Sequence, residues 1–144
     1  MLAATHRFIV HNNETSVTLD FSTNAANESA TVTYKGKKPT SSAGISYGSE
    51  QSQSASTDII NGGTEALTTI DNTTDNWFGI DGVFEVVTDN ASADGDVVLL
   101  HEISTDGGTT WPSAAADWDP DTDADVVAVL TLGGAETVST SFEI

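Results

Sequence analysis

Hydrophobic and polar residues alternate with a period of two through much of the chain. The alternation is clearest at residues 16–21, where Val17, Leu19 and Phe21 are separated by polar residues, and it returns at residues 137–144. Successive side chains of a strand point to opposite faces of its sheet. The pattern therefore predicts half-buried strands with one apolar face at both places.

Further apolar segments of strand length are bounded by turn-forming residues. These predicted strands are residues 7–10, 30–34, 77–80, 83–88, 97–103 and 126–132. The last two are apolar on both faces, which predicts strands in the middle of the structure. Asp and Gly accept the backbone angles of tight turns, so hairpins are expected at Asp81-Gly82, Asp94-Gly95, Asp106-Gly107-Gly108 and Gly133-Gly134.

The helical pattern is absent, and at most a turn or two is expected near residues 113–117. A chain of 144 residues has the usual size of one domain. We therefore predict a single all-β domain over residues 1–144, an antiparallel β-sandwich or jelly roll of about eight strands.

A long polar segment, residues 35–76, interrupts the pattern. Residues 39–57 alone contain 9 Ser or Thr among 19 residues. A stretch of this kind inside a compact domain is unusual. Two interpretations remain open, a flexible loop and an extended arm that becomes ordered on a partner.

The charge is strongly and unevenly acidic. The chain has 22 Asp and Glu against 4 Lys and Arg, a net charge of -18. Such a surface repels phosphate backbones, so nucleic acid is not an expected partner. All the positive charge lies before residue 39, at Arg7, Lys35, Lys37 and Lys38, and these four are the candidate partner-binding residues. An ordinary solvated turn is the alternative reading of the three lysines.

Several classes of function are excluded or disfavoured. The chain has no cysteine, which removes disulfides and thiolate chemistry, and no apolar run long enough to cross a membrane. No nucleophile elbow, phosphate-binding loop or paired-histidine zinc motif is present. His6 and His11 fall on opposite faces of any strand, and His101 lies in an apolar run. We therefore expect no enzyme, no catalytic residue and no cofactor.

An acidic run at residues 117–125 has a carboxylate at every second position, as in calcium-binding loops. Counted from Asp119, however, the sixth position is Ala124 where an EF-hand has Gly, and the twelfth is Leu130 where it has Glu. A solvated acidic loop is the expected structure, and no metal site is predicted. A looser calcium site remains an open alternative.

Residues 104–111 fit the Asp-box pattern Ser-x-Asp-x-Gly-x-x-Trp of sialidase propellers and other β proteins. The Asp of this motif bonds the amides of a turn and the Trp folds back over it. A propeller needs several repeats, and the motif occurs once. The match therefore predicts a hairpin loop and not a sialidase.

Three tryptophans, Trp77, Trp111 and Trp118, lie beside predicted turns and outside the strand centres. A tryptophan in such a place either packs over its loop or offers a flat stacking surface for a sugar ring. These three residues are the candidate carbohydrate-binding residues if the domain is a carbohydrate-binding module.

The second half of the chain, about residues 83–144, resembles small β-structured virion proteins of tailed bacteriophages. The resemblance rests on its Thr-Asp-Gly-Gly-Thr-Thr-Trp turn, its Thr- and Ser-rich strands and its closing strand. It implies a structural protein of the virion, assembled in the host cytoplasm, such as a capsid decoration or cement protein.

We therefore expect a non-enzymatic decoration or cement protein, oligomeric, whose partners are the major capsid protein or other virion proteins. Residues 35–76 and the four cations would meet an acidic capsid surface. A tail or head-fibre component and a carbohydrate-binding β-sandwich module are the alternatives.

Overall fold

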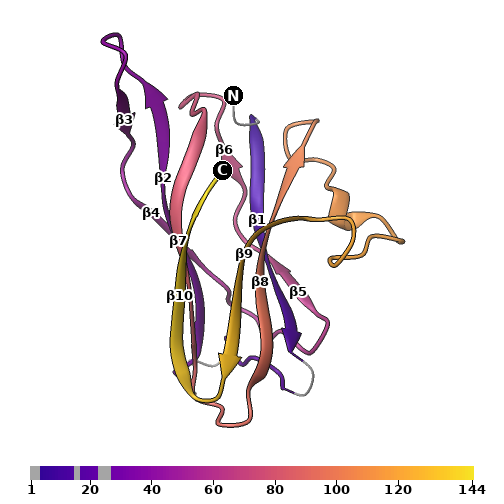
Figure 1. Cartoon of the computed structure of the whole chain (residues 1–144). Coiled ribbons are helices and arrows are strands. Elements are labelled where there is room, and N and C mark those ends of the chain that lie inside the picture. Colours follow the sequence, from indigo (N-terminus) through magenta and orange to yellow (C-terminus); the bar gives the residue numbers. More distant parts are fainter. Residues whose placement is uncertain (1–3, 15–16, 23–26) are drawn as a thin grey trace.

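Two antiparallel sheets face each other in the computed structural model, which describes residues 4–14, 17–22 and 27–144 (Figure 1). The first sheet has the order β5 (Thr64–Ala66), β1 (Thr5–Glu14), β8 (Asp94–Ser104) and β9 (Asp125–Gly133), and β6 (Ile70–Asp71) also pairs with β1. The second has the order β10 (Glu136–Glu143), β7 (Gly79–Thr88), β2 (Ser29–Pro39) and β3 (Ile45–Tyr47), and β4 (Gln51–Ser54) also pairs with β2. The predicted all-β sandwich is confirmed.

Helical structure in the described residues is limited to one 3-10 turn, η1 (Pro112–Ala114), close to where a turn was expected. No helix long and apolar enough to cross a membrane occurs in this part of the chain.

The predicted strands 7–10, 30–34, 83–88, 97–103 and 126–132 lie inside the longer observed strands β1, β2, β7, β8 and β9, respectively. The predicted strand 137–144 matches β10 except for Ile144, and of the predicted strand 77–80 only Gly79 and Ile80 lie in β7. The segment at residues 16–21 is different. Val17, Leu19 and Phe21 are buried as predicted, but Leu19 makes only an isolated bridge to Ile59, and Ser16 lies outside the described residues. The apolar alternation therefore correctly predicted that these side chains are buried, but the prediction of a strand in a sheet is wrong.

The predicted turn at residues 81–82 is wrong, because both residues lie inside β7. Gly82 pairs with Phe142 of β10, and a Cβ added to Gly82 would lie 2.4 Å from Phe142 Cζ. The glycine is needed for this close approach of the ring and not for a bend. Asp94 and Gly95 likewise begin β8 instead of forming the turn before it. The chain turns at residues 106–108 and 133–134 as predicted, but neither turn closes a tight hairpin, because β9 and β10 lie in different sheets and a long loop, residues 105–124, separates β8 from β9.

Aromatic side chains join the two sheets at the centre. Phe8 of β1 is fully buried, and its ring centroid lies 5.8 Å from that of Tyr34 on β2 and 5.5 Å from that of Phe142 on β10. Edge-to-face pairs of this kind are worth about 0.5–1.5 kcal/mol beyond the area they bury. Phe8 therefore anchors one sheet to the other.

Strand β8 runs through the middle of the first sheet, as its apolar faces predicted, whereas β9 is an edge strand. Val98 of β8 and Ile9 of β1 form a small cluster on the outer face, with Trp118 and Ala124 of the following loop packed against it. On β9, Val126 and Val129 remain 56% and 48% exposed. The prediction that β9 is central is therefore wrong.

The predicted arm, residues 35–76, is joined to both sheets along its length. Four short strands, β3 to β6, pair its backbone with β1 and β2. These strands carry few buried side chains, so backbone pairing and not apolar alternation holds them in place. The hairpin formed by the end of β2 and β3 extends beyond the sandwich at one corner, and the loop between β8 and β9 extends from another side (Figure 1).

A histidine pair is buried at one end of the core. His6 Nδ1 lies 2.9 Å from His101 Nε2, and the two side chains belong to neighbouring strands. Burial and the adjacent His101 lower the pKa of His6 to about 4. Burial also lowers the pKa of His101, against the opposing influence of Asp125 and Glu102. Both rings are therefore neutral in the folded protein at pH 7.

The histidine pair should make the fold sensitive to mild acid. The unfolded chain protonates His6 near pH 6.5, whereas the folded chain does so only near about 4. The free energy of unfolding should therefore fall as the pH drops from about 7 to about 4, by on the order of 3 kcal/mol from this residue. Urea unfolding at a series of pH values measures this loss.

A His6→Gln variant serves as the control, since it cannot titrate and retains the carboxylates common to both proteins. Its free energy of unfolding should depend less steeply on pH between 6.5 and 4. Equal slopes for the variant and the parent would contradict a role for the buried ring.

Candidate interaction surfaces

The projecting hairpin, residues 39–47, extends away from the body of the sandwich. Pro39 pairs with Ile45, and the tip is closed by a hydrogen bond of 2.9 Å from the Thr40 amide to the Gly44 carbonyl. Ile45 and Tyr47 are 55% and 54% exposed. No residue of the hairpin carries a charge. An extension with exposed apolar side chains and no charge is suited to contact with another protein surface.

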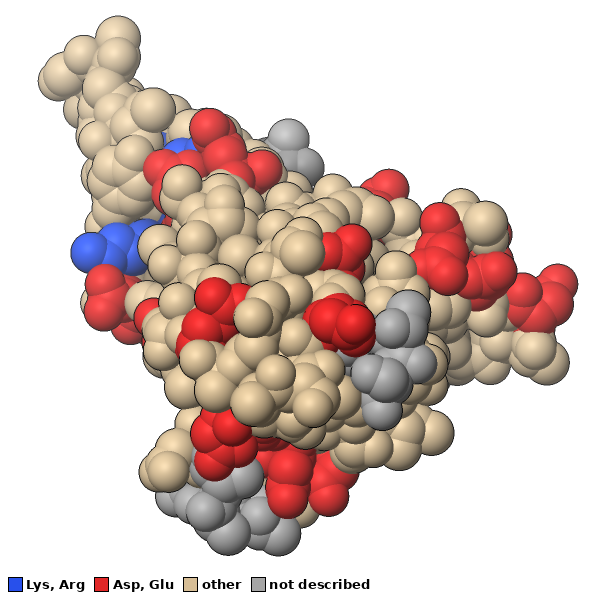
Figure 2. Space-filling model, turned by 60° about the horizontal axis from the view of Figure 1, so that its bottom comes forward, with Lys and Arg blue, Asp and Glu red and all other residues tan. Residues whose placement is uncertain are grey.

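This lack of charge contrasts with the body of the sandwich. Figure 2 shows carboxylates spread over much of the visible face, while the protruding part at the upper left is uncharged. Repulsion between acidic surfaces therefore acts on the body and spares the hairpin.

Each of the four candidate cations is paired with a carboxylate of this chain. Arg7 of β1 bonds Glu102, and its guanidinium lies 4.1 Å from the centroid of the Trp111 ring. Lys35 and Lys38 of β2 make longer pairs, of 3.4 Å and 3.6 Å, with carboxylates at the surface. The structure thus places the three lysines together on β2, puts Arg7 in the other sheet, and leaves no unpaired basic patch.

Lys37 is the most buried of these cations, with 3% of its surface exposed. Its ammonium group lies 2.7 Å from Asp81 Oδ1 and also bonds Glu143. Burial by itself lowers the pKa of Lys37, but the two carboxylates outweigh it and leave that pKa raised. Lys37 therefore joins β2, β7 and β10 and is not available to a partner.

The three tryptophans do not form a shared platform. Trp77 and Trp111 are 7% and 8% exposed, and Trp118 is half-buried over the outer apolar cluster. The Trp111 ring is covered by Arg7, and its Nε1 donates a hydrogen bond of 3.1 Å to the Gly108 carbonyl. Trp77 and Trp111 therefore lack the open flat faces that a stacking surface needs.

The Asp-box segment builds a turn, as its sequence predicted. Asp106 Oδ1 accepts hydrogen bonds from the amides of Thr109 and Thr110, at 3.1 Å and 2.8 Å, and from the Ser104 hydroxyl. The bonds from Thr110, then that from Ser104, lower the pKa of Asp106 to about 2. The carboxylate is thus occupied in holding its own loop.

The acidic loop also uses its carboxylates internally. Asp123 Oδ2 accepts from the Asp119 amide at 2.9 Å, and Asp121 Oδ1 lies 3.4 Å from Nε2 of the buried His11. Within residues 4–14, 17–22 and 27–144, no group of three or more His, Cys, Asp or Glu side chains is arranged to hold a metal ion.

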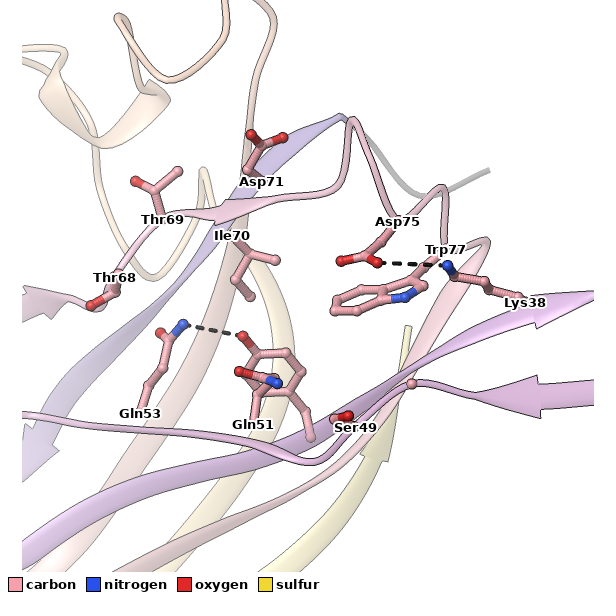
Figure 3. A pocket seen from close by; sticks show the side chains of 12 residues that line it. Lys38, Ser49, Gln51, Gln53, Thr68, Thr69, Ile70, Asp71, Asp75 and Trp77 are labelled. Atoms are coloured by element: carbon pink, nitrogen blue, oxygen red, sulfur yellow. Dashed lines mark hydrogen bonds and ion pairs between the residues drawn. The ribbon is translucent and has the colours of Figure 1, made fainter.

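A polar pocket of about 440 Å³ opens beside the base of the projecting hairpin (Figure 3). Its floor consists of the buried side chains of Tyr34, Ile70 and Trp77. Its remaining walls are mostly polar and come from β2, β4, β6 and the segments between them: Lys38, Gly48, Ser49, Gln51, Gln53, Thr68, Thr69, Asp71 and Asp75.

Trp77 is held rigidly in this floor. Its amide donates to Asn72 Oδ1 at 2.8 Å, and Asn72 Nδ2 donates to the Trp77 carbonyl at 3.0 Å. The indole lies over Gly36, where an added Cβ would come within 1.8 Å of Trp77 Cδ2. The ring position therefore depends on the glycine of β2.

The sequence pointed to Trp77 and Lys38 as candidate binding residues, but it did not predict that they line one pocket. It missed Tyr34, Gln51 and Gln53. Two glutamines at alternate positions of one strand are a signal that both amides share a face, but β4 has no apolar alternation to reveal it as a strand.

Comparison with known proteins adds no family to this description. No protein-family model, no curated protein and no solved structure matches the chain. A function is therefore inferred from the hairpin, the charges and the pocket described above.

Replacing Lys37 should test whether the lysines are structural. A Lys37→Met variant leaves Asp81 and Glu143 facing each other without a cation, so it should lower the free energy of unfolding by about 1–3 kcal/mol. A matched Lys35→Met variant removes an exposed pair and should change it by less than about 0.5 kcal/mol.

Chemical denaturation of both variants provides the measurement. Equal stability of the Lys37 and Lys35 variants would contradict the structural role of Lys37.

Proposed function

We propose that this chain is a non-enzymatic structural protein of a tailed-phage particle, a decoration or cement protein attached through its projecting hairpin. The observation that carries the proposal is the uncharged hairpin with exposed Ile45 and Tyr47 on a chain of net charge -18. The resemblance of residues 83–144 to small virion proteins supports the choice of particle. A head-fibre or tail component would use the same hairpin.

The pairing of the cations revises how attachment works. Because Lys37 is buried and Lys35 and Lys38 are paired within the chain, charge attraction to an acidic capsid has little to act through. Apolar contact at the hairpin replaces it, and attachment should depend only weakly on salt.

Neighbouring subunits have a second surface available. Strand β9 is at the edge of its sheet and exposes Val126 and Val129. Edge strands offer unpaired backbone groups to another chain. This supports an oligomer on the particle, with the major capsid protein or other virion proteins as partners of the hairpin.

We propose a role without catalysis, in which the histidines and the Asp-box carboxylate are structural. His6 and His101 are buried against each other, and Asp106 is bonded within its own turn. Contact and not reaction is the proposed mechanism.

Attachment to the particle should fail when the hairpin is altered. An Ile45→Asp variant places a charge on the projecting surface and should bind particles that lack the chain at least about 10-fold more weakly, as loss of an apolar interface contact predicts. Ile60→Asp, at a site 65% exposed and away from the hairpin, is the matched control and should bind normally. Co-sedimentation with particles measures both.

Two results would count against the proposal. Normal binding by Ile45→Asp would move the contact elsewhere on the molecule. Absence of the chain from purified particles, judged by mass spectrometry, would remove the virion role itself.

A further inference from the structure

The polar pocket combines an aromatic floor with a rim of hydroxyl and amide groups. Tyr34, Ile70 and Trp77 are 5%, 5% and 7% exposed, whereas the side chains of Gln51, Thr68 and Thr69 are open to solvent. A ligand that fits must therefore present an apolar side to the floor and several hydrogen-bonding groups to the rim.

Two buried polar atoms of this pocket lack a partner. Trp77 Nε1 is an unmet donor and Gln53 Oε1 an unmet acceptor, and both are closed to bulk solvent. Gln53 Nε2 is used, since it donates to the Tyr34 hydroxyl at 3.2 Å. Buried polar groups without a partner are rare in folded proteins and call for an explanation. Because both atoms are closed to solvent, a ligand hydroxyl reaches them only when Gln53 or the backbone at Gly48 moves, and the open groups of the rim are its first contacts.

The charges of the pocket argue against an ionic ligand. Lys38 is paired with Asp75, as Figure 3 shows, and Asp71 accepts from both the amide and the hydroxyl of Thr73. These bonds lower the pKa of Asp71. The remaining negative charge, on a strongly acidic molecule, disfavours anions. No cluster of metal ligands was found among the described residues.

Gly48 lines the pocket and lies beside the indole edge of Trp77. A Cβ built at this residue would lie 3.5 Å from Trp77 Nε1, which is an ordinary contact distance. A larger side chain at Gly48 would therefore fill the part of the pocket beside Trp77.

We propose that this pocket binds a neutral sugar unit, with its hydroxyls on Gln51, Gln53 and Thr69 and one apolar edge of its ring against the parts of Tyr34, Ile70 and Trp77 that line the pocket. The site differs from a platform of three tryptophans, because Trp111 and Trp118 take no part in it. It does not rest on the proposed virion role, and neither fails with the other.

Titration with four neutral sugars, glucose, galactose, mannose and N-acetylglucosamine, tests the site. Single sugars bind weakly, so each is raised to about 50 mM while the indole and side-chain amide signals are followed by NMR. At least one sugar should give saturable shifts of the Trp77 indole N–H and of the Gln51 and Gln53 amides. The indole signals of Trp111 and Trp118 should stay in place and serve as internal controls.

Two variants make the test specific. Gln51→Ala should weaken binding at least 5-fold, and Gly48→Val should abolish it by filling the space beside the indole edge. Ser41→Ala, in the projecting hairpin, should bind like the parent, and circular dichroism should show all three folded.

The inference is overturned if none of the four sugars gives saturable shifts, or if all three indole signals move together. It is also overturned if glucose 6-phosphate or calcium chloride shifts the pocket signals at lower concentration than any neutral sugar. If the Gly48→Val variant does not fold, the test depends on the Gln51→Ala variant alone. Binding of a sugar by Gln51→Ala with the affinity of the parent would refute the site.

Discussion

The contact of Phe8 with Tyr34 and Phe142 holds the two sheets face to face. Their ring centroids are separated by 5.8 Å and 5.5 Å, and each ring comes from a different strand. Large aromatic side chains contribute the most to a core of this size. The same contact extends outward, since Tyr34 lies edge-on to Trp77 at 6.5 Å and its hydroxyl bonds Gln53. The pocket is therefore continuous with the core and inherits its rigidity.

The four Lys and Arg side chains all form ion pairs within the chain. With four cations against 22 acidic residues, every positive charge is placed where it neutralises carboxylates of the chain itself. Lys37 does so inside the structure, where losing its charge would leave two carboxylates near each other. The face seen in Figure 2 carries many carboxylates, and the projecting hairpin has no charged residue. The body of the sandwich therefore repels acidic partners, whereas the projecting hairpin does not.

Apolar alternation was enough to predict the sandwich and most of its strands, because burial of one face leaves a period of two in the sequence. It was not enough at Gly82. The pair Asp81-Gly82 is typical of a tight turn, but here the glycine lies within β7 and makes room for the ring of Phe142. It also failed across residues 35–76, whose short strands are held by backbone pairing with few buried side chains. The candidate sites were also only partly predictable. Lys37 could be recognised as a cation, but its partners Asp81 and Glu143 are distant in sequence. Gln51 and Gln53 lie on a strand that has no apolar alternation, so their shared face could not be predicted.

The most direct test of the account is to ask what the projecting hairpin touches. A photoreactive residue replaces Ile45 in one protein and Val83, which is 44% exposed on β7, in another. After irradiation of assembled particles, we expect cross-links from position 45 to other virion proteins and few from position 83. Cross-links only from position 83, or from neither position, would contradict it.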